Sequence, residues 1–439
     1  MHRDVARPAL DWPFILIVIA VGIALRLAWF TVAEGNLLNF IGAGEATRVA
    51  LSLARTGQFA DAFYAGYGHT AHLTPISPAI AAGVMMLLGV DTAASNIALL
   101  CWSLGQVILG WVLMLALFRR LGVDGAALRW GIGILALVPV FMGDEVIVFR
   151  FWEGALTLAL VVANLILVHD LTGRRNPGWP RLAGIAALTA FTFFLCPPAG
   201  LAIDLCWAIW AIRTLSLPRI AGFAAMSAAA LGLIVLPWAM RNAAVMGEPV
   251  LLRSNAGLEL AIANHPAALS GRPNGEVYFE RLLAVQPYFS VPARQKIRDA
   301  GGEVAYARGL GRQATQWIAD HPAGFAQLFL RHLRQFFFPE SWQLMFGLPG
   351  LRAGIMGVVS AIGLAGLAAG LWQRRPGYGM LAVYLGTVAL PYAVVQPVQR
   401  YSYLVYGLLV MLAADALVRL ARWALARYRA PAIPMPAAA

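Results

Sequence analysis

The sequence predicts an all-α polytopic membrane protein with about ten transmembrane helices. Hydrophobic residues make up 60% of the chain, charged residues make up only 12%, and the mean hydropathy is +0.71. A soluble globular domain does not reach these values, because its core cannot bury so much apolar surface. Apolar runs of about the length of a span recur along the chain, and arginines stand in the short loops between several of them.

The first apolar run covers residues 13–33 and follows Arg3 and Arg7. A basic start before an apolar segment is also typical of a signal peptide. This run is longer than the apolar region of a typical signal peptide, and many further apolar runs follow it. We therefore expect it to remain as the first transmembrane helix.

The first outer loop, residues 34–92, contains the polar-apolar stretch GEATRVALSLARTGQF at 44–59. The segment PISPAIAAGVMMLLG at 75–89 has 15 residues and two prolines, which makes it too short to cross a bilayer alone. If it crossed, every later arginine-rich loop would turn outward, against the positive-inside tendency. We expect a juxtamembrane or re-entrant helix at 75–89.

Nine further spans are expected, and a small extracytoplasmic segment precedes the last three. Their ranges are 93–118, 131–147, 153–171, 182–196, 198–213, 219–237, 352–372, 378–396 and 402–420. This threading places both chain ends in the cytoplasm, as the positive-inside tendency requires. The loops that face the cytoplasm with them carry Arg119, Arg120, Arg129, Arg174, Arg175, Arg181, Arg213, Arg219, Arg374 and Arg375.

The chain is predicted to have four parts. Residues 1–237 form an N-terminal transmembrane module with the first outer loop, 238–351 an extracytoplasmic segment, 352–420 the C-terminal transmembrane helices, and 421–439 a basic tail with a Pro/Ala-rich end. Within the extracytoplasmic segment, residues 321–338 space their apolar side chains at helical intervals. Two interpretations of this helix are open: an amphipathic helix at the membrane interface, or a buried helix of a small capping subdomain.

The net charge of +12 comes almost entirely from arginine, since Lys296 is the only lysine. In a membrane protein this balance is typical of cytoplasmic anchoring loops, so nucleic acid is not expected as a partner. Cys101, Cys196 and Cys206 lie in apolar runs, without the spacing of a metal site or of a disulfide framework. We interpret them as small core residues.

Ionisable residues at the ends of apolar runs are candidates for function, because burying them is costly. Glu45 and Arg48 are three residues apart and share a helix face, either as a solvated pair or as part of a site. Arg26 lies in the outer half of the first span and needs a counter-charge, from Glu45 or from an acid of the hinge between two later spans. A structural ion pair and a catalytic network explain Arg26 equally well. The hinge supplies Asp144, Glu145, Arg150 and Glu153.

The stretch 237–266 is rich in side chains that bind oxyanions and hydroxyls. They are Arg241, Asn242, Arg253, Asn255, Asn264 and His265. A loop that satisfies its own backbone explains the amides as well. Arg400 stands just before the last span and adds a cation at the same surface, either for an anionic ligand or as an interfacial anchor flanked by tyrosines.

His69 and His72 have the i, i+3 spacing that also suits a metal ion. Two histidines without a clear third ligand do not define a metal site, so no metal is predicted. We keep both residues as candidates for substrate binding.

Four stretches of the chain carry a resemblance to a known family. They are GEATRVALSLARTGQF followed by TAHLTPISP, FRFWEGALTLAL (149–160), PWAMRNAAVMGEPVLLRSNAGLELAIANHP (237–266) and GEVAYARGLGRQATQWIADHP (302–322). In order and spacing they resemble the GT-C superfamily of integral-membrane glycosyltransferases, which includes the protein O-mannosyltransferases and the bacterial aminoarabinose transferase of lipid A. Many members carry an acidic pair where this chain has Glu45 between glycine and alanine.

The resemblance implies a membrane glycosyltransferase that moves a sugar from a polyprenyl-phosphate-linked donor to an extracytoplasmic acceptor, by an inverting single displacement. It implies that Glu45, in the catalytic first outer loop, is the base. The residues expected at the donor phosphate are Arg241, Arg400 and Arg26. The residues expected to support catalysis are Arg48, Arg150, Glu153 and Asp144, and those expected to bind substrate are His69, His72, Arg253, Asn255 and Asn264. No cofactor is implied.

The same reasoning predicts a place in the bacterial inner membrane, with the active site on the periplasmic side. Two alternatives stay open: a non-enzymatic flippase or transporter of lipid-linked sugars, and an inactive scaffold of a polysaccharide assembly complex. Transporters usually place polar residues at the bilayer midplane, often on broken helices in repeated halves. In this sequence the polar groups gather at the outer rim and no repeat is visible, which favours the transferase.

Overall fold

The computed structural model describes residues 10–35, 44–141, 145–173, 177–344 and 347–428. Within these ranges the regular secondary structure consists of helices, and an isolated antiparallel bridge joins Ala60 and His69. Six of the described helices are long and apolar enough to cross a membrane: α1 (Trp12–Glu34), α4 (Ala93–Arg120), α7 (Gly154–Leu171), α10 (Leu217–Met246), α16 (Pro349–Trp372) and α18 (Gln399–Tyr428). The all-α prediction is confirmed for the described residues, and these helices support a polytopic membrane protein.

Four more helices occupy the other segments that were expected to span: α5 (Gly125–Leu137), α8 (Trp179–Leu195), α9 (Pro197–Thr214) and α17 (Tyr378–Val394). α5 has 13 residues, and α8 and α17 have 17 residues each, so they are apolar but short. α9 carries the acidic Asp204 within its length. Each of the expected spans therefore contains a helix, although length and composition alone identify only six as membrane-crossing within the described ranges.

Three helices differ from their expected bounds, and a proline explains the first difference. In the span expected at 131–147, the helix α5 ends at Leu137. Pro139 follows, and proline both lacks the N–H that a further turn needs and disfavours the helical conformation of the residue before it. The span expected to end at residue 237 continues through Pro237 to Met246 in α10, so the predicted domain boundary lies inside this helix. α18 similarly runs to Tyr428, into the predicted tail.

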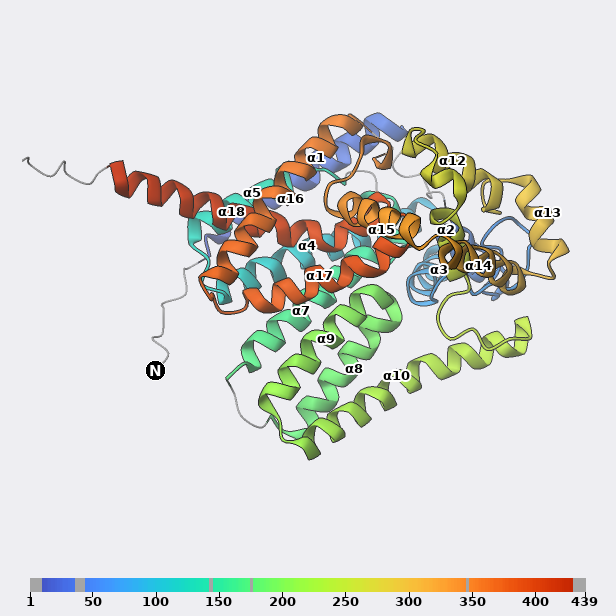
Figure 1. Ribbon diagram of the computed structural model, residues 1–439, viewed down its shortest axis with the longest axis horizontal. Coiled ribbons are helices and arrows are strands. Elements are labelled where there is room, and N and C mark those ends of the chain that lie inside the picture. The colour runs from blue at the N-terminus through green and yellow to red at the C-terminus, as the bar shows by residue number, and fades with distance from the viewer. Residues whose placement is uncertain (1–9, 36–43, 142–144, 174–176, 345–346, 429–439) are drawn as a thin grey trace, which may run out of the picture.

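Shorter helices come from the first outer loop and from the segment before α16. They are α2 (Glu45–Thr56), α3 (Ile76–Leu88), α11 (Ala256–Ala263), α12 (Asn274–Val285), α13 (Val291–Asp299), α14 (Glu303–Asp320) and α15 (Pro322–Phe337). α2 packs on α3 and α11 packs on α14, and Figure 1 shows α2, α3, α12, α13 and α14 gathered at one end of the molecule. We call α2, α3 and α11 to α14 the cap. The segment expected as a juxtamembrane or re-entrant helix is α3, which has 13 residues.

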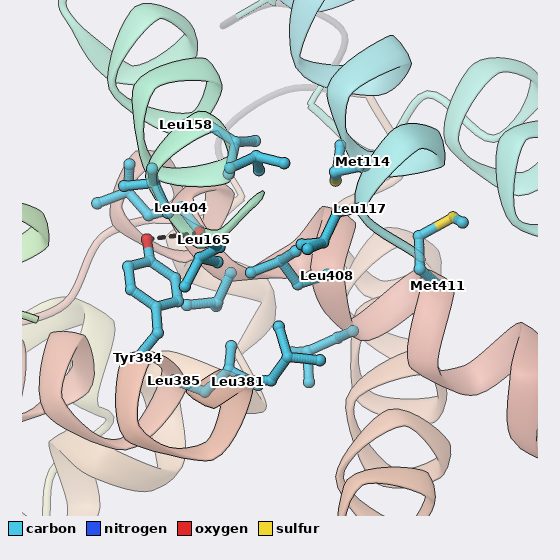
Figure 2. Close-up of a cluster of buried hydrophobic side chains, with 14 of the residues drawn as sticks. Met114, Leu117, Leu158, Leu165, Leu381, Tyr384, Leu385, Leu404, Leu408 and Met411 are labelled. Atoms are coloured by element: carbon cyan, nitrogen blue, oxygen red, sulfur yellow. Dashed lines mark hydrogen bonds between the residues drawn. The ribbon is translucent and has the colours of Figure 1, made fainter. Parts of the chain in front are cut away.

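The bundle core is built from α4, α7, α17 and α18, whose buried side chains are drawn in Figure 2. Leu117 of α4, Leu165 of α7 and Leu408 of α18 are completely buried. The Tyr384 hydroxyl of α17 donates to the Leu404 carbonyl of α18 at 3.1 Å, so that this buried hydroxyl is paired. This packing fixes the helix ends on which the cap rests.

Ion pairs join helix ends on the side of the bundle away from the cap. Arg120 at the end of α4 pairs with Asp170 near the end of α7, with a nitrogen–oxygen distance of 3.2 Å. Arg422 of α18 pairs with Asp124, which precedes α5, at 2.8 Å. Figure 1 shows the end of α18 on the opposite side of the molecule from α2 and α14. Loops that carry the predicted cytoplasmic arginines therefore lie at the end opposite the cap.

α15 is the helix for which two interpretations were open. Leu328 and Phe336 are buried, and α15 packs on α17, as expected for a helix of a capping subdomain. Its other face stays open, with Leu330 64% exposed, as expected for an interfacial helix. α15, α16 and α17 together border an apolar groove of about 590 Å³.

Candidate functional site

Glu45 is the first residue of α2 and lies in the cap. The preceding Gly44 has a φ of 123°, a backbone conformation that favours glycine, and its N–H donates to the Tyr288 hydroxyl at 2.9 Å. A carboxylate in the first turn is stabilised by the positive end of the helix dipole. The side chain of Glu45 is 24% exposed, so a ligand can reach it.

Two side chains from distant parts of the sequence contact the Glu45 carboxylate. His72 Nε2 lies 3.8 Å from Glu45 Oε1, and Gln286 Nε2 donates to the same oxygen at 3.3 Å. The His72 ring is buried and packs edge-on against Phe63, with 4.9 Å between ring centroids. The structure thus brings together Glu45 and His72, both named from the sequence, and adds Gln286, which the sequence analysis missed.

Glu303 holds the segment before His72 in place. Its carboxylate accepts from Thr70 Oγ1 at 2.7 Å, from the Ala71 N–H at 2.6 Å and from Ser254 Oγ at 2.8 Å. Because Glu303 is buried, these donors satisfy a charge that would otherwise be costly. The sequence analysis missed this role, since an acid at the start of a helix is ordinary and two of the three donors lie 232 and 233 residues earlier.

Arg241 fixes the same segment from another side. Its guanidinium donates to the Thr70 carbonyl at 2.8 Å, to the Phe59 carbonyl at 2.6 Å and to Asn242 Oδ1 at 2.9 Å. His69 Nδ1 lies 3.5 Å from the same guanidinium. These contacts engage Arg241 and His69 in the architecture of the loop. The phosphate role of Arg241 stays a prediction from the resemblance.

Arg253 and Glu153, two of the predicted site residues, form an ion pair with each other. The Arg253 guanidinium also lies 3.5 Å from Thr74 Oγ1 and 3.4 Å from the Leu195 carbonyl oxygen. Arg253 therefore joins the segment before α3, the residue before α7 and the end of α8. This ion pair connects the cap to the transmembrane bundle.

A second acid, Glu259, faces the charges around Glu45. It lies half-buried in α11 and interacts electrostatically with Arg400, His72, Glu45 and Arg253. Burial raises the pKa of Glu259 above its ordinary value, although the neighbouring Arg400 and His72 oppose this effect. The sequence analysis missed Glu259; the only available signal was a single acid within the apolar stretch AGLELAIA.

Arg400 lies in the first turn of α18, and its side chain is exposed. The guanidinium lies over the Tyr401 ring, 5.2 Å from the centroid, and interacts electrostatically with Glu45 and Glu259. Within the described part of the chain, Arg400 makes no direct ion pair with a carboxylate. It therefore stays available to an anionic ligand. We call Glu45, His72, Glu259 and Arg400 the Glu45 cluster.

Arg26 lies in the bundle and not in the Glu45 cluster. It is buried, pairs with the hinge acid Glu145, and donates to the Ala136 carbonyl at 2.6 Å and to the Leu135 carbonyl at 3.0 Å. Of the two interpretations of Arg26, these contacts favour the structural ion pair. Its predicted role at the donor phosphate receives no support from this placement.

The other predicted residues have contacts of their own. Arg150 is buried and donates to the Val146 carbonyl at 2.9 Å, and Arg48 lies over the Tyr288 ring at 5.5 Å from the centroid. Asn255 precedes α11 as its N-cap residue. Asn264 donates to the Leu260 carbonyl at 3.0 Å and to the Val394 carbonyl at 2.9 Å, which ties the end of α11 to the end of α17. Asp144 lies outside the described residues.

His69 and His72 have different neighbours, Arg241 for the first and Glu45 for the second. Among the residues that the structure describes, no group of three or more His, Cys, Asp and Glu side chains is arranged to hold a metal ion.

No protein-family model and no curated protein matches the chain, but solved structures do. The apo oligosaccharyltransferase of Archaeoglobus fulgidus aligns with a TM-score of 0.55 and 17% identity, over 95% of this chain and 51% of that one. The same organism's oligosaccharyltransferase AglB, in complex with an inhibitory peptide and a dolichol-phosphate, aligns with a TM-score of 0.52 and 14% identity, over 97% and 52% of the two chains. ArnT from Cupriavidus metallidurans, bound to undecaprenyl phosphate, aligns with a TM-score of 0.37 and 14% identity, over 97% and 82%.

The two archaeal structures show that the chain shares the fold of these oligosaccharyltransferases over most of its length, which agrees with the resemblance stated from the sequence. The chain spans about half the length of these archaeal enzymes. At 14% and 17% identity the likeness carries neither a substrate nor the role of a residue. The function must therefore be argued from the site itself.

Proposed function

We propose that this chain is a membrane glycosyltransferase that moves a sugar from a polyprenyl-phosphate-linked donor to a hydroxyl of an extracytoplasmic lipid, glycan or protein. The observation that carries the proposal is the Glu45 carboxylate, contacted by His72 and Gln286, in the electrostatic neighbourhood of the exposed Arg400. Such a transfer needs a base for the acceptor and a cation for the departing phosphate. The Glu45 cluster contains both.

The reaction follows from these two groups. The acceptor oxygen attacks the anomeric carbon of the sugar while its proton passes to the Glu45 carboxylate. The bond between the anomeric carbon and the phosphate oxygen breaks, and its electron pair stays on the phosphate, where Arg400 stabilises the growing charge. One displacement inverts the anomeric centre, so a single carboxylate suffices, unlike the two carboxylates of retaining hydrolases.

The contacts of Glu45 suggest how the base is oriented. Both His72 and Gln286 approach Oε1, and Oε2 accepts no hydrogen bond from a described residue. We assign Oε2 to the acceptor proton. Because Glu303 and Arg241 fix the segment before His72, we assign them a positioning role, and we assign the Arg253–Glu153 pair the task of holding the cap on the bundle.

A lipid-linked donor is supported by the fold and by one surface feature. The AglB structure with the same fold holds a dolichol-phosphate. In this chain the groove between α15, α16 and α17 is lined by apolar side chains such as Leu333, Leu367 and Leu385, with Arg334 among its lining residues. An isoprenoid chain in this groove would keep its apolar surface away from water. We place the donor lipid there.

The proposed orientation puts the cap on the periplasmic side of the bacterial inner membrane and both chain ends in the cytoplasm. The arginine-bearing loops at the end opposite the cap support it, since cytoplasmic loops are enriched in arginine. A donor dissolved in the bilayer and an acceptor outside the cytoplasm would then meet at the Glu45 cluster.

The variant Glu45→Gln tests the base. Glutamine keeps the size of the side chain but cannot take up a proton, so we expect transfer to fall roughly 100-fold or more, with insertion and folding unchanged. Membranes with the wild-type chain, the variant or neither are given radiolabelled sugars on polyprenyl phosphate, and label is counted in lipid, glycan and protein. Glu280→Gln is the matched control, because Glu280 is exposed and pairs with the exposed Arg272.

Wild-type rates from the Glu45→Gln chain would rule out Glu45 as the base. If the wild-type chain transfers no label but moves lipid-linked sugars across reconstituted vesicles, the flippase alternative is correct. If it does neither, the scaffold alternative remains.

A further inference from the structure

The exposed side chain of Arg400 rests on an aromatic ring at the start of α18. Its guanidinium lies over the ring of Tyr401, 5.2 Å from the centroid, within the distance at which an aromatic face attracts a cation. An arginine side chain has many rotamers, and a contact that restricts them lowers the entropy lost when a ligand binds. The Tyr401 ring can restrict Arg400 only if the ring itself is held in place.

Two further rings hold the Tyr401 ring. Tyr401 of α18 stacks on Tyr392 of α17, with 4.4 Å between the ring centroids and 20° between the ring planes. Tyr392 stacks in turn on Phe336 of α15, at 5.5 Å and 12°. Phe336 and Tyr392 are buried, so the half-buried Tyr401 is the outer ring of the three. We call Phe336, Tyr392 and Tyr401 the ring stack.

α15 also holds the backbone around the ring stack. Ser402 Oγ, next to Tyr401, donates to the Phe336 carbonyl at 2.7 Å. Gln396 Nε2, in the segment between α17 and α18, donates to Gln335 Oε1 at 2.9 Å. These contacts fix that segment and the start of α18 on one face of α15.

The groove in which we place the donor lipid lies along another face of α15. Leu333, Arg334 and Phe337 of this helix line it. Phe337 packs edge-on against Phe336, with 5.1 Å between ring centroids. The same helix therefore forms a wall of the groove and supports the ring stack under Arg400. The cation for the lipid phosphate and the groove for its isoprenoid chain are thus joined through α15.

We propose that Tyr401 is a positioning residue for the lipid phosphate, because its ring holds the Arg400 guanidinium in the orientation that binds this phosphate. This inference rests on the proposed function. Since Tyr392 and Phe336 fix the Tyr401 ring, Arg400 loses less freedom when the phosphate binds. A side chain without a ring at position 401 would keep the charge of Arg400 but not its orientation.

The test uses the full-length chain in lipid nanodiscs, with undecaprenyl phosphate and the uncharged undecaprenol as probes. Tyr401→Leu removes the ring, so we expect its Kd for undecaprenyl phosphate to rise roughly threefold to tenfold. Its Kd for undecaprenol should stay unchanged, because Arg400 acts on the phosphate, which the alcohol lacks. A tyrosine that only supported the groove would weaken the binding of both probes alike when replaced.

Matched variants separate the ring from other causes. Tyr401→Phe keeps the ring and should restore most of the binding. In an Arg400→Gln background, Tyr401→Leu should weaken binding no further, since it acts through Arg400. Tyr428→Leu makes the same change at the exposed end of α18 and should leave both Kd values unchanged. Tyr401→Met is a second replacement without a ring, for use if the leucine variant does not fold.

An unchanged Kd for undecaprenyl phosphate in a folded Tyr401→Leu or Tyr401→Met chain overturns the inference while leaving the proposed function intact. An equal loss of undecaprenol binding, a loss that persists in the Arg400→Gln background, or a Tyr401→Phe chain that binds as weakly as Tyr401→Leu also overturns it. If the wild-type chain binds no undecaprenyl phosphate, the phosphate role of Arg400 fails, and the proposed function fails with it.

Discussion

Burial separates the ionisable residues of this chain into two kinds. Arg26 and Arg241 have donors engaged by backbone carbonyls, and Arg26 also has a buried counter-ion in Glu145. Glu45 and Arg400 remain accessible. The sequence does not distinguish Arg26 and Arg241 from Arg400, because residue type and distance from an apolar run do not reveal which arginine will donate to a backbone carbonyl oxygen. The sequence therefore named Glu45, His72 and Arg400 as candidates but could not separate them from residues that hold the fold.

His265 supplies a prediction about pH. Burial, with the charges of Arg281 and Arg331, lowers the pKa of His265 to about 4, below the ordinary value of about 6.5. The folded state keeps this histidine neutral, so its contribution to stability is complete above pH 6.5 and is lost as the pH falls from 6.5 towards 4. The loss amounts to roughly 3 kcal/mol at most.

We expect His265→Asn to reduce the fall in thermal midpoint between pH 7.5 and pH 4.5, measured on the purified chain. His321→Asn is the control, because that histidine is exposed and stacks on Trp317. An equally steep fall in the His265→Asn chain would show that other groups cause the acid sensitivity.

At the scale of helices, the close approach of α11 and α14 supplies the next prediction. A Cβ added at Gly257 would lie 2.0 Å from the Ala307 carbonyl oxygen and 3.1 Å from the Gly311 Cα, so the two backbones leave no room for a side chain. Gly257→Ala must push α11 away from α14, which we expect to cost roughly 1–3 kcal/mol. Since α11 carries Glu259 and α14 begins with Glu303, transfer should fall as well.

Gly309→Ala, in α14, is the matched control. A Cβ at Gly309 meets nothing within 4 Å, so this substitution should stabilise the helix by about 0.5–1 kcal/mol. Thermal unfolding of the two variants in one detergent compares them directly. Equal thermal midpoints would show that α11 can move away from α14 without a loss of stability.

Helix positions were easier to predict than helix bounds. Ten apolar runs became ten helices because each run must bury its surface, whatever its neighbours do. Bounds depend on neighbours: Pro139 stands just after the end of α5, whereas α10 continues through Pro237. Glu259 was missed for a related reason. Its neighbours Arg400 and Glu45 lie far away in the sequence, and only the packing of α11 brings them together.

At the scale of the whole molecule, the structure separates two sets of charges. The Glu45 cluster lies at the cap, and the pairs Arg120–Asp170 and Arg422–Asp124 lie at the other end of the bundle. The length of α9 gives the approximate distance between the two sets of charges. α9 begins next to Leu195, whose carbonyl lies near Arg253, and its 18 residues extend about 27 Å. That length is close to the apolar thickness of a bilayer.

Accessibility from the two sides of the membrane tests this arrangement. Gln313 of α14 and Arg213 near the end of α9 are both exposed, and they belong to opposite ends of the molecule. In a chain whose three native cysteines are replaced, a membrane-impermeant maleimide should label Gln313→Cys in intact cells but Arg213→Cys only after permeabilisation. The reason is that arginine-rich loops stay in the cytoplasm. Labelling of both positions from outside would mean that the bundle does not span the bilayer along α9, and the reverse pattern would place the Glu45 cluster in the cytoplasm, out of reach of an extracytoplasmic acceptor.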